Sequence, residues 1–230
     1  MKSNCPNGVF RRGSLFVEWW HAPVTPELVN ALTRRARKTK HGFTDILRAS
    51  NEVVAQYPAR DCLRLAKQLF ASDVHQARML AVFIFGRMAA QSRPVMKFLR
   101  QRVSRDPDWR VQEILAQAFD RYCADIGYEK ALPIIKDWLS ASHPNVRRAV
   151  TEGLRIWTSR EHFRDHPQTA IELLGGLKDD ESEYVRKSAG NALRDISRQH
   201  PALVRAEVET WDRSDRRVAQ TYKLASKFLP

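Results

Sequence analysis

Three stretches, DWRVQE (108–113), HPNVRRA (143–149) and SEYVRKS (182–188), decide the fold, because each repeats one pattern around a valine. The shared valines are 35 and 39 residues apart, and weaker copies of the pattern, DVHQARM and SDRRVAQ, begin at residues 73 and 214. Repeats of this length are typical of paired helices that stack side by side and share one core. We therefore expect a repeat array.

Helical spacing of apolar residues continues outward from these stretches. The chain has nine glycines and no Asp-Gly turn, and its one Asn-Gly pair, at residues 7–8, lies outside the repeats. It shows no sustained alternation of apolar and polar residues, so strands are not expected. Connections such as 106–108 and 142–144 carry the capping residues and prolines with which helices begin. The predicted fold class is all-α, a right-handed α-solenoid of HEAT-like repeats. Its helices are expected at 26–38, 45–56, 59–71, 74–91, 94–103, 109–124, 130–140, 145–158, 168–177, 181–199, 202–211 and 215–228.

The 230 residues suffice for one array with a sizeable core, and we expect a single domain over 25–230. Residues 1–24 break the repeat and include two arginines and two tryptophans, so they could form a flexible basic arm, a cap over the first repeat, or both. No apolar run is long enough to cross a bilayer, and the first nine residues lack a secretory signal. We expect a cytoplasmic protein without a membrane partner.

The cysteines and histidines do not suggest a metal site. Cys5, Cys62 and Cys123 are odd in number, far apart and free of any CxxC spacing, so reduced thiols are expected. His143, His166 and His200 each precede a proline, which is typical of residues at the start of a helix.

Charge is more informative. The chain has 39 Lys and Arg against 26 Asp and Glu, a formal net charge of +13, and its pI is near 10.1. An excess of this size suits a polyanionic partner such as nucleic acid, although a merely solvated basic surface has the same composition. The positions of the charges must decide between the two.

Polar side chains recur on one face of the second helix in each repeat. Residues two, six and nine positions after each shared valine stay on that face. They are Glu113, Gln117 and Asp120 after Val111; Arg148, Glu152 and Arg155 after Val146; and Lys187, Asn191 and Arg194 after Val185. Because second helices line the concave side of a solenoid, these stripes predict an extended binding trough.

Pairs of cations also lie in the first turn of these helices. Cations there oppose the helix dipole, so helix stability does not explain them, whereas phosphate binding does. An inter-repeat ladder of Arg with Asp or Glu is the alternative for any single arginine. The pairs are Arg147 with Arg148, Arg186 with Lys187, and Arg216 with Arg217.

Trp109 lies one turn before Glu113, so an indole and a carboxylate project from the same side of a helix at the head of the trough. The spacing alone leaves open whether this tryptophan is a core residue or part of a site.

Residues 102–229 resemble the HEAT-like DNA alkylation repair glycosylases of the AlkC/AlkD type, most strongly in HPNVRRAVTEGLR (143–155) and LKDDESEYVRKSAGNALRDISRQHPALV (177–204). The resemblance implies that Trp109 is a cleft tryptophan, Glu113 the catalytic carboxylate and Arg148 a ligand of the DNA backbone. AlkD-like members have Asp in place of Glu113 and a second cleft tryptophan in place of Asn191.

The implied reaction is hydrolysis of the N-glycosidic bond of N3- or N7-alkylated purines in duplex DNA, without metal or organic cofactor. Glu113 and Trp109 are the expected catalytic residues. The expected DNA ligands are Arg148, Arg155, Lys187, Asn191, Arg194, Arg216 and Arg217. We expect a monomer that associates with the nucleoid when bound to DNA. Two alternatives keep the fold: a non-catalytic protein that binds DNA structures, and an adaptor that binds an acidic protein.

Overall fold

The computed structural model describes residues 24–229, which form thirteen α-helices and three short 3-10 helices and contain no strand. This confirms the all-α class. The first half of the array contains α1 (Pro26–Arg37), α2 (Thr44–Gln56), α3 (Ala59–Phe70), α4 (His75–Met88), η1 (Ala89–Gln91), α5 (Arg93–Gln101), η2 (Val103–Arg105) and α6 (Trp109–Ile126). The second half contains α7 (Tyr128–Leu139), α8 (Pro144–Gly153), η3 (Trp157–Ser159), α9 (Glu161–Asp165), α10 (Pro167–Gly175), α11 (Glu183–Ser197), α12 (Pro201–Glu209) and α13 (Arg216–Ala225).

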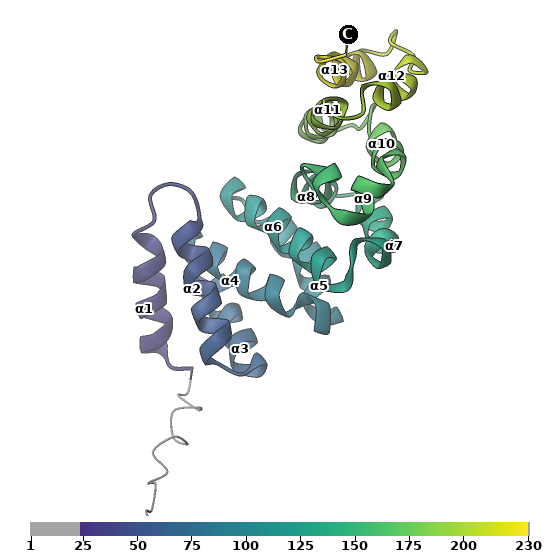
Figure 1. The fold of residues 1–230 in the computed structure, drawn as a ribbon. Helices are drawn as coiled ribbons and strands as arrows, with labels where there is room; N and C mark the ends of the chain where they lie inside the picture. The colour runs from purple at the N-terminus through teal and green to yellow at the C-terminus, as the bar shows by residue number, and fades with distance from the viewer. Residues whose placement is uncertain (1–23, 230) are drawn as a thin grey trace, which may run out of the picture.

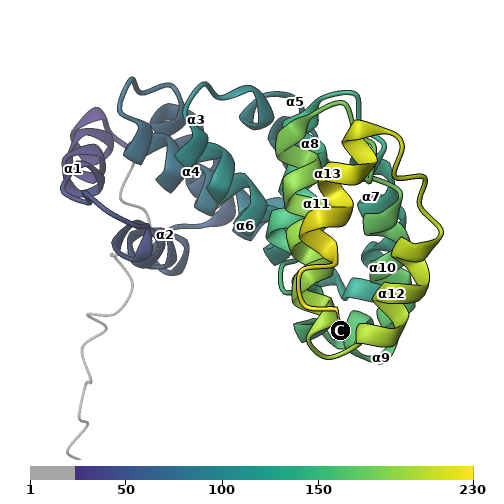
Figure 2. The same ribbon diagram turned by 90° about the horizontal axis from the view of Figure 1, so that it is seen from above.

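The helices form a curved array with an inner and an outer row (Figure 1). In the inner row α4, α6, α8, α11 and α13 each pack directly on the next. Figure 2 shows α8, α11 and α13 as one row beside α7, α10 and α12. The outer row is less continuous. Its helices α10 and α12 pack on each other, but a pocket separates α5 from α7. A curved array crowds its concave side and opens its convex side, so the inner row forms the concave face.

The predicted repeat phase is confirmed by burial. Val111, Val146 and Val185 are at most 1% exposed, and Val218 in the weaker copy is buried too. All four belong to one cluster of buried side chains that extends from the first helix to the last. The inner helices therefore share a continuous core.

An inter-repeat ladder follows directly after these core positions. Its arginines occupy the position after the core residue, and each donates to backbone carbonyls five and six residues earlier in the chain. Each guanidinium also reaches the next repeat, at donor–acceptor distances of 2.6–3.1 Å. The pairs are Arg78 with Asp106, Arg147 with Asp180, and Arg186 with Gln220. The expected ladder of Arg with Asp or Glu is thus confirmed for Arg147. Arg186 also joins the next repeat, but it donates to the amide oxygen of Gln220 and not to a carboxylate.

The helix predicted at 145–158 is wrong at its end, because α8 stops at Gly153. A Cβ at Gly153 would lie 2.4 Å from the carbonyl oxygen of Ala116, so α8 approaches α6 too closely there for any side chain. Arg160 then folds back and donates to the Gly153 carbonyl at 3.2 Å, which satisfies a free group at the helix end. The turn that follows buries Trp157 and leads into the unpredicted helix α9.

Other expectations concern buried groups. Trp138, Trp157 and Trp211 are buried in the core, and the thiols of Cys62 and Cys123 are buried and free. Between residues 24 and 229 no helix is both long and apolar enough to span a membrane. The expected arm or cap at the N-terminus, together with Cys5, lies outside the described residues.

Candidate nucleic-acid interface

A small pocket opens on the concave face between α6 and α8, with a volume of about 120 Å³. It brings together Trp109 and Glu113 from α6 and Arg148 from α8, the three residues on which the sequence-based site centres. Gln112, Ala116, Asn145, Ala149 and Glu152 complete its lining. Glu113 and Arg148 line the same pocket because they occupy the same position in the repeat. Each lies two residues after a buried valine, on adjacent inner helices.

Trp109 is the first residue of α6, and its side chain is 62% exposed. It is therefore not a core residue. Asp108 caps the helix by accepting from the amide of Arg110 at 2.9 Å, and it also holds the Arg110 guanidinium through two bonds of 2.9 Å. That guanidinium lies 5.6 Å from the centre of the Trp109 ring. The hydrogen bond from Arg110 lowers the pKa of Asp108, so the support for the indole stays charged.

Glu113 and Arg148 are free to meet a ligand. Neither side chain makes a hydrogen bond or ion pair with another residue of the described chain. Ala116 and Ala149, both 3% exposed, line the pocket between the two helices with small side chains. The pocket thus presents two carboxylates, those of Glu113 and Glu152, together with the guanidinium of Arg148 and an exposed indole around one opening.

The polar stripe continues onto α11 with different partners. Lys187 is exposed and pairs with Glu183 at 2.6 Å, an i,i+4 pair on the surface. Asn191 is half-buried, and its amide has no hydrogen bond within residues 24–229. Arg194 lies 3.4 Å from Asp195. Of these side chains, Lys187 is the most accessible to a ligand.

Two residues of the predicted polar stripes, Arg155 and Asp120, make ion pairs with other parts of the array. Arg155 does not lie on the face of α8, because that helix ends at Gly153, and its Nε donates to Asp195 of α11 at 2.7 Å. Asp120 accepts two bonds from Arg160, at 3.0 and 2.8 Å. These contacts join segments 40 residues apart, so both side chains hold repeats together.

Arg216 and Arg217 occupy the first turn of α13, as expected. Both are exposed, and Arg217 lies 3.4 Å from the N-cap Asp215. Arg216 has no ion pair among residues 24–229.

Tyr184 is a surface residue that the sequence reasoning missed. It is 74% exposed and lies three residues before Lys187, so it shares the face of α11 with that lysine. Its place directly before the buried valine of SEYVRKS could have been noticed, since Asn145 occupies the same position in α8 and lines the pocket. Within the described residues no group of three or more His, Cys, Asp or Glu side chains could hold a metal ion.

Comparison with known proteins finds chains of similar sequence and fold. The crystal structure of AlkD2 from Streptococcus mutans is 46% identical in sequence and superposes with a TM-score of 0.87, covering 88% of this chain and 98% of that one. The structure of smu.31 from Streptococcus mutans UA159 is 43% identical with a TM-score of 0.84, covering 88% and 100% of the two chains. The Bacillus subtilis (strain 168) protein YhaZ is 37% identical over 87 residues, which are 36% of this chain and only 24% of YhaZ.

Residues 43–227 match the family described as DNA alkylation repair enzyme, a range that contains the whole pocket and every inner helix. The resemblance to AlkC/AlkD-type proteins that the repeats suggested is therefore confirmed, and the chain belongs to the DNA alkylation repair enzyme family.

Proposed function

We propose that this protein is a DNA glycosylase that removes N3- or N7-alkylated purines from duplex DNA bound along its concave face. The observation that carries the proposal is the unpaired carboxylate of Glu113, held beside the exposed indole of Trp109 and opposite the unpaired Arg148. DNA phosphates repel a free carboxylate. Such a group therefore weakens binding to DNA unless the bound DNA carries positive charge next to the carboxylate.

Such positive charge arises in the proposed reaction. An alkylated purine is already cationic, so it leaves with the electron pair of the N-glycosidic bond without being protonated. The sugar then has oxocarbenium character at C1′, which Glu113 stabilises while it positions a water molecule for attack there. The water oxygen forms the new bond to C1′, and its proton passes to the carboxylate or to solvent.

The neighbouring side chains hold the substrate. Trp109 presses its indole against the deoxyribose or the cationic base, and Arg148 and Lys187 bind phosphates on either side. A pocket of about 120 Å³ is small, which favours attack on a base that stays in the helix over capture of a fully extruded nucleotide.

A non-catalytic DNA-binding role is the second candidate, and Asn191 favours it. This half-buried amide stands on α11 where AlkD-like proteins have a second cleft tryptophan, so fewer aromatic side chains are available to contact a cationic base. The two functions share the same cations and differ in what Glu113 does.

Glu113→Gln separates them. This change keeps the shape of the side chain and removes its charge. The transition state should therefore lose more electrostatic stabilisation than the ground state, and the rate of excision should fall by about 10²–10³-fold. The measurement is release of free base, or of alkali-labile sites, from methylated duplex DNA. Undamaged duplex should bind at least as tightly as before. Full excision by the variant would remove Glu113 from catalysis, and an inactive wild-type protein that still binds duplex would leave the non-catalytic role.

A further inference from the structure

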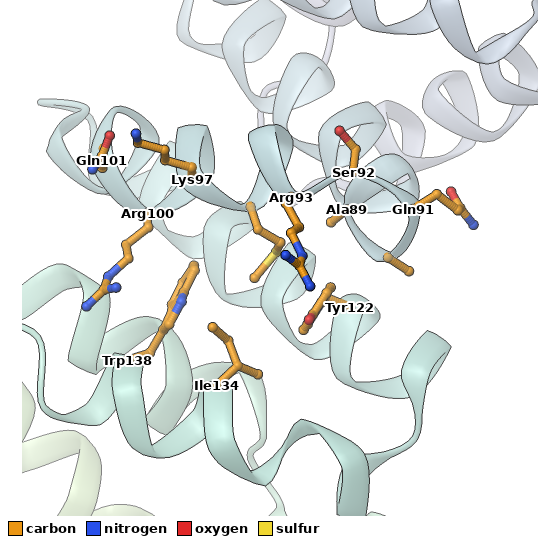
Figure 3. Close-up of a pocket in the computed structure, with 12 residues that line it drawn as sticks. Ala89, Gln91, Ser92, Arg93, Lys97, Arg100, Gln101, Tyr122, Ile134 and Trp138 are labelled. Carbon is orange, nitrogen blue, oxygen red and sulfur yellow. The ribbon is translucent and has the colours of Figure 1, made fainter.

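A second and larger pocket lies on the outer side of the array. Its volume is about 720 Å³, and it separates the outer helices α5 and α7 where the curvature of the array opens them. Figure 3 shows its side chains: Arg93, Lys97 and Arg100 project from α5, and Ile134 and Trp138 project from α7 toward them. Tyr122 of α6 contributes from between the two helices.

This pocket is independent of the concave face. Tyr122 follows Glu113 by nine residues in α6, which is two and a half helical turns, so the two side chains project from opposite sides of that helix. A ligand between α5 and α7 would therefore not compete with DNA in the trough.

The rim of the pocket carries three cations, of which two have no ion-pair partner within residues 24–229. Arg93, Lys97 and Arg100 recur at i, i+4 and i+7, one face of α5, and span about 10 Å along the helix. Arg100 is paired with Asp137 of α7 at 2.8 Å, which closes one end of the pocket. Arg93 and Lys97 have no ion pair within residues 24–229, and no Asp or Glu is among the residues that line the pocket.

The floor is apolar and partly aromatic. Trp138 and Met96 are almost fully buried, and Tyr122 and Ile134 are half-buried beside them. In Figure 3 the guanidinium of Arg93 points toward Tyr122, so a cation lies directly above this floor. An apolar floor below a cationic edge can accept a large apolar side chain whose chain neighbours are acidic.

We propose that the pocket between α5 and α7 binds an acidic peptide segment of a partner protein, anchored by a large aliphatic or aromatic side chain. Two unpaired cations and an absence of lining carboxylates give charge complementarity to Asp and Glu. The exposed parts of Tyr122 and Ile134, which lie beside the buried Trp138 and Met96, take the anchor. This distinguishes the surface from one that contacts only phosphates.

The test uses a fluorescein-labelled peptide, EDLFDE, with blocked ends, and the full chain. Anisotropy titrations at physiological salt should show EDLFDE binding at least about tenfold more tightly than EDGGDE, which lacks the anchor, or QNLFNQ, which lacks the charges. Saturation of the protein with duplex DNA should leave the affinity for EDLFDE unchanged.

A charge-reversed pair of variants locates the site. Arg93→Glu with Lys97→Glu should weaken binding of EDLFDE by at least about tenfold. Arg60→Glu with Lys67→Glu changes the net charge equally on α3, where both side chains are exposed and outside the pocket, and should have little effect.

Three results would overturn the proposal: no binding of EDLFDE, equal binding of EDGGDE, or equal losses in the two double variants. Circular dichroism confirms that each variant is folded. A labelled oligo(dT) that loses affinity in the α5 variant, while EDLFDE does not, would instead assign the pocket to single-stranded nucleic acid.

Discussion

Arg147 and Arg148 are adjacent in the chain but face different surroundings. Arg147 has a side chain only 13% exposed, and it joins α8 to Asp180 in the next repeat through two bonds of 2.6 Å. Arg148 lines the concave pocket and has no partner within residues 24–229. A helix turns about 100° per residue, which is enough to place one cation between repeats and the next on the ligand face.

Truncation of each arginine should therefore have opposite consequences. Arg147→Ala leaves Asp180 almost buried without its partner, and we expect the free energy of unfolding to fall by about 3–5 kcal/mol. Arg148→Ala should change it by less than about 0.5 kcal/mol but weaken duplex binding by about tenfold or more, the scale of a lost charge-assisted contact. Urea unfolding and DNA titrations of the two variants measure both quantities. A large stability loss in Arg148→Ala would place that residue in the ladder instead.

The same contrast shows how far residue-level reasoning from sequence can reach. The positions two residues after the buried valines were predictable, because the helical period fixes which residues share a face. Which member of each cation pair forms the ladder was not, since it depends on the distance to the next repeat. The exposure of Trp109 was equally undetermined, because a first-turn residue can point inward or outward with the same spacing.

At the scale of single helices, one histidine cap should make stability depend on pH. His143 is the N-cap of α8 and accepts from the amide of Asn145 through Nδ1 at 3.3 Å. Burial, followed by the nearby Arg105 and Arg147, lowers the pKa of His143. The folded protein thus binds this proton less readily than the unfolded chain, so the stability that the neutral cap contributes is present above pH 6.5 and is lost as the pH falls through the folded pKa.

We expect His143→Asn to keep the cap through its amide oxygen while removing this titration. The free energy of unfolding should then fall less between pH 7.5 and pH 5.5 than it does in the wild type, and His143→Ala should cost about 1 kcal/mol at pH 7.5. His41→Asn, at an exposed position between α1 and α2, is the control. If His143→Asn keeps the full wild-type pH dependence, another group causes it.

The end of α8 provides a second test at this scale. Gly153→Ala puts a methyl group against the Ala116 carbonyl, and separating α6 from α8 should cost about 1–3 kcal/mol. Gly176→Ala is the matched control, because its Cβ would meet neighbours only at 3.6 and 3.7 Å. Thermal unfolding of the two variants should differ by several degrees. Equal melting temperatures would mean that the close approach of the two helices is not required.

The number and order of the long helices could be predicted from sequence because their apolar period is strong. The end of α8 and the short helix α9 could not, because both depend on contacts between repeats. Gly153 has to fit against α6, and Phe163 of α9 packs against the buried Trp157 with ring centres 4.9 Å apart. Periodicity within one segment carries no information about such neighbours.

For the whole molecule, the arrangement of charge matters more than its sum. The chain has a formal charge of +13, and its described residues carry cations on both faces, such as Arg148 on the concave side and Arg93 and Lys97 on the outer side. Only the cations of the concave row can contact one duplex together. The outer helices carry their own cations, which a duplex in the trough does not reach. Net charge alone therefore predicts attraction to DNA, and position predicts how many phosphates are neutralised.

Salt dependence measures that number directly. For duplex DNA the logarithm of the binding constant falls with the logarithm of salt concentration with a slope of about −0.9 per phosphate contact. Arg148→Glu with Lys187→Glu removes two concave cations and should make the slope shallower by about two units. Arg60→Glu with Lys67→Glu changes the net charge by the same amount on α3 but removes no phosphate contact, so it should change the slope by much less than the concave variant does, through screened long-range attraction alone. If the slopes of the two variants fall equally, DNA binds to the basic surface at large and not along the inner row.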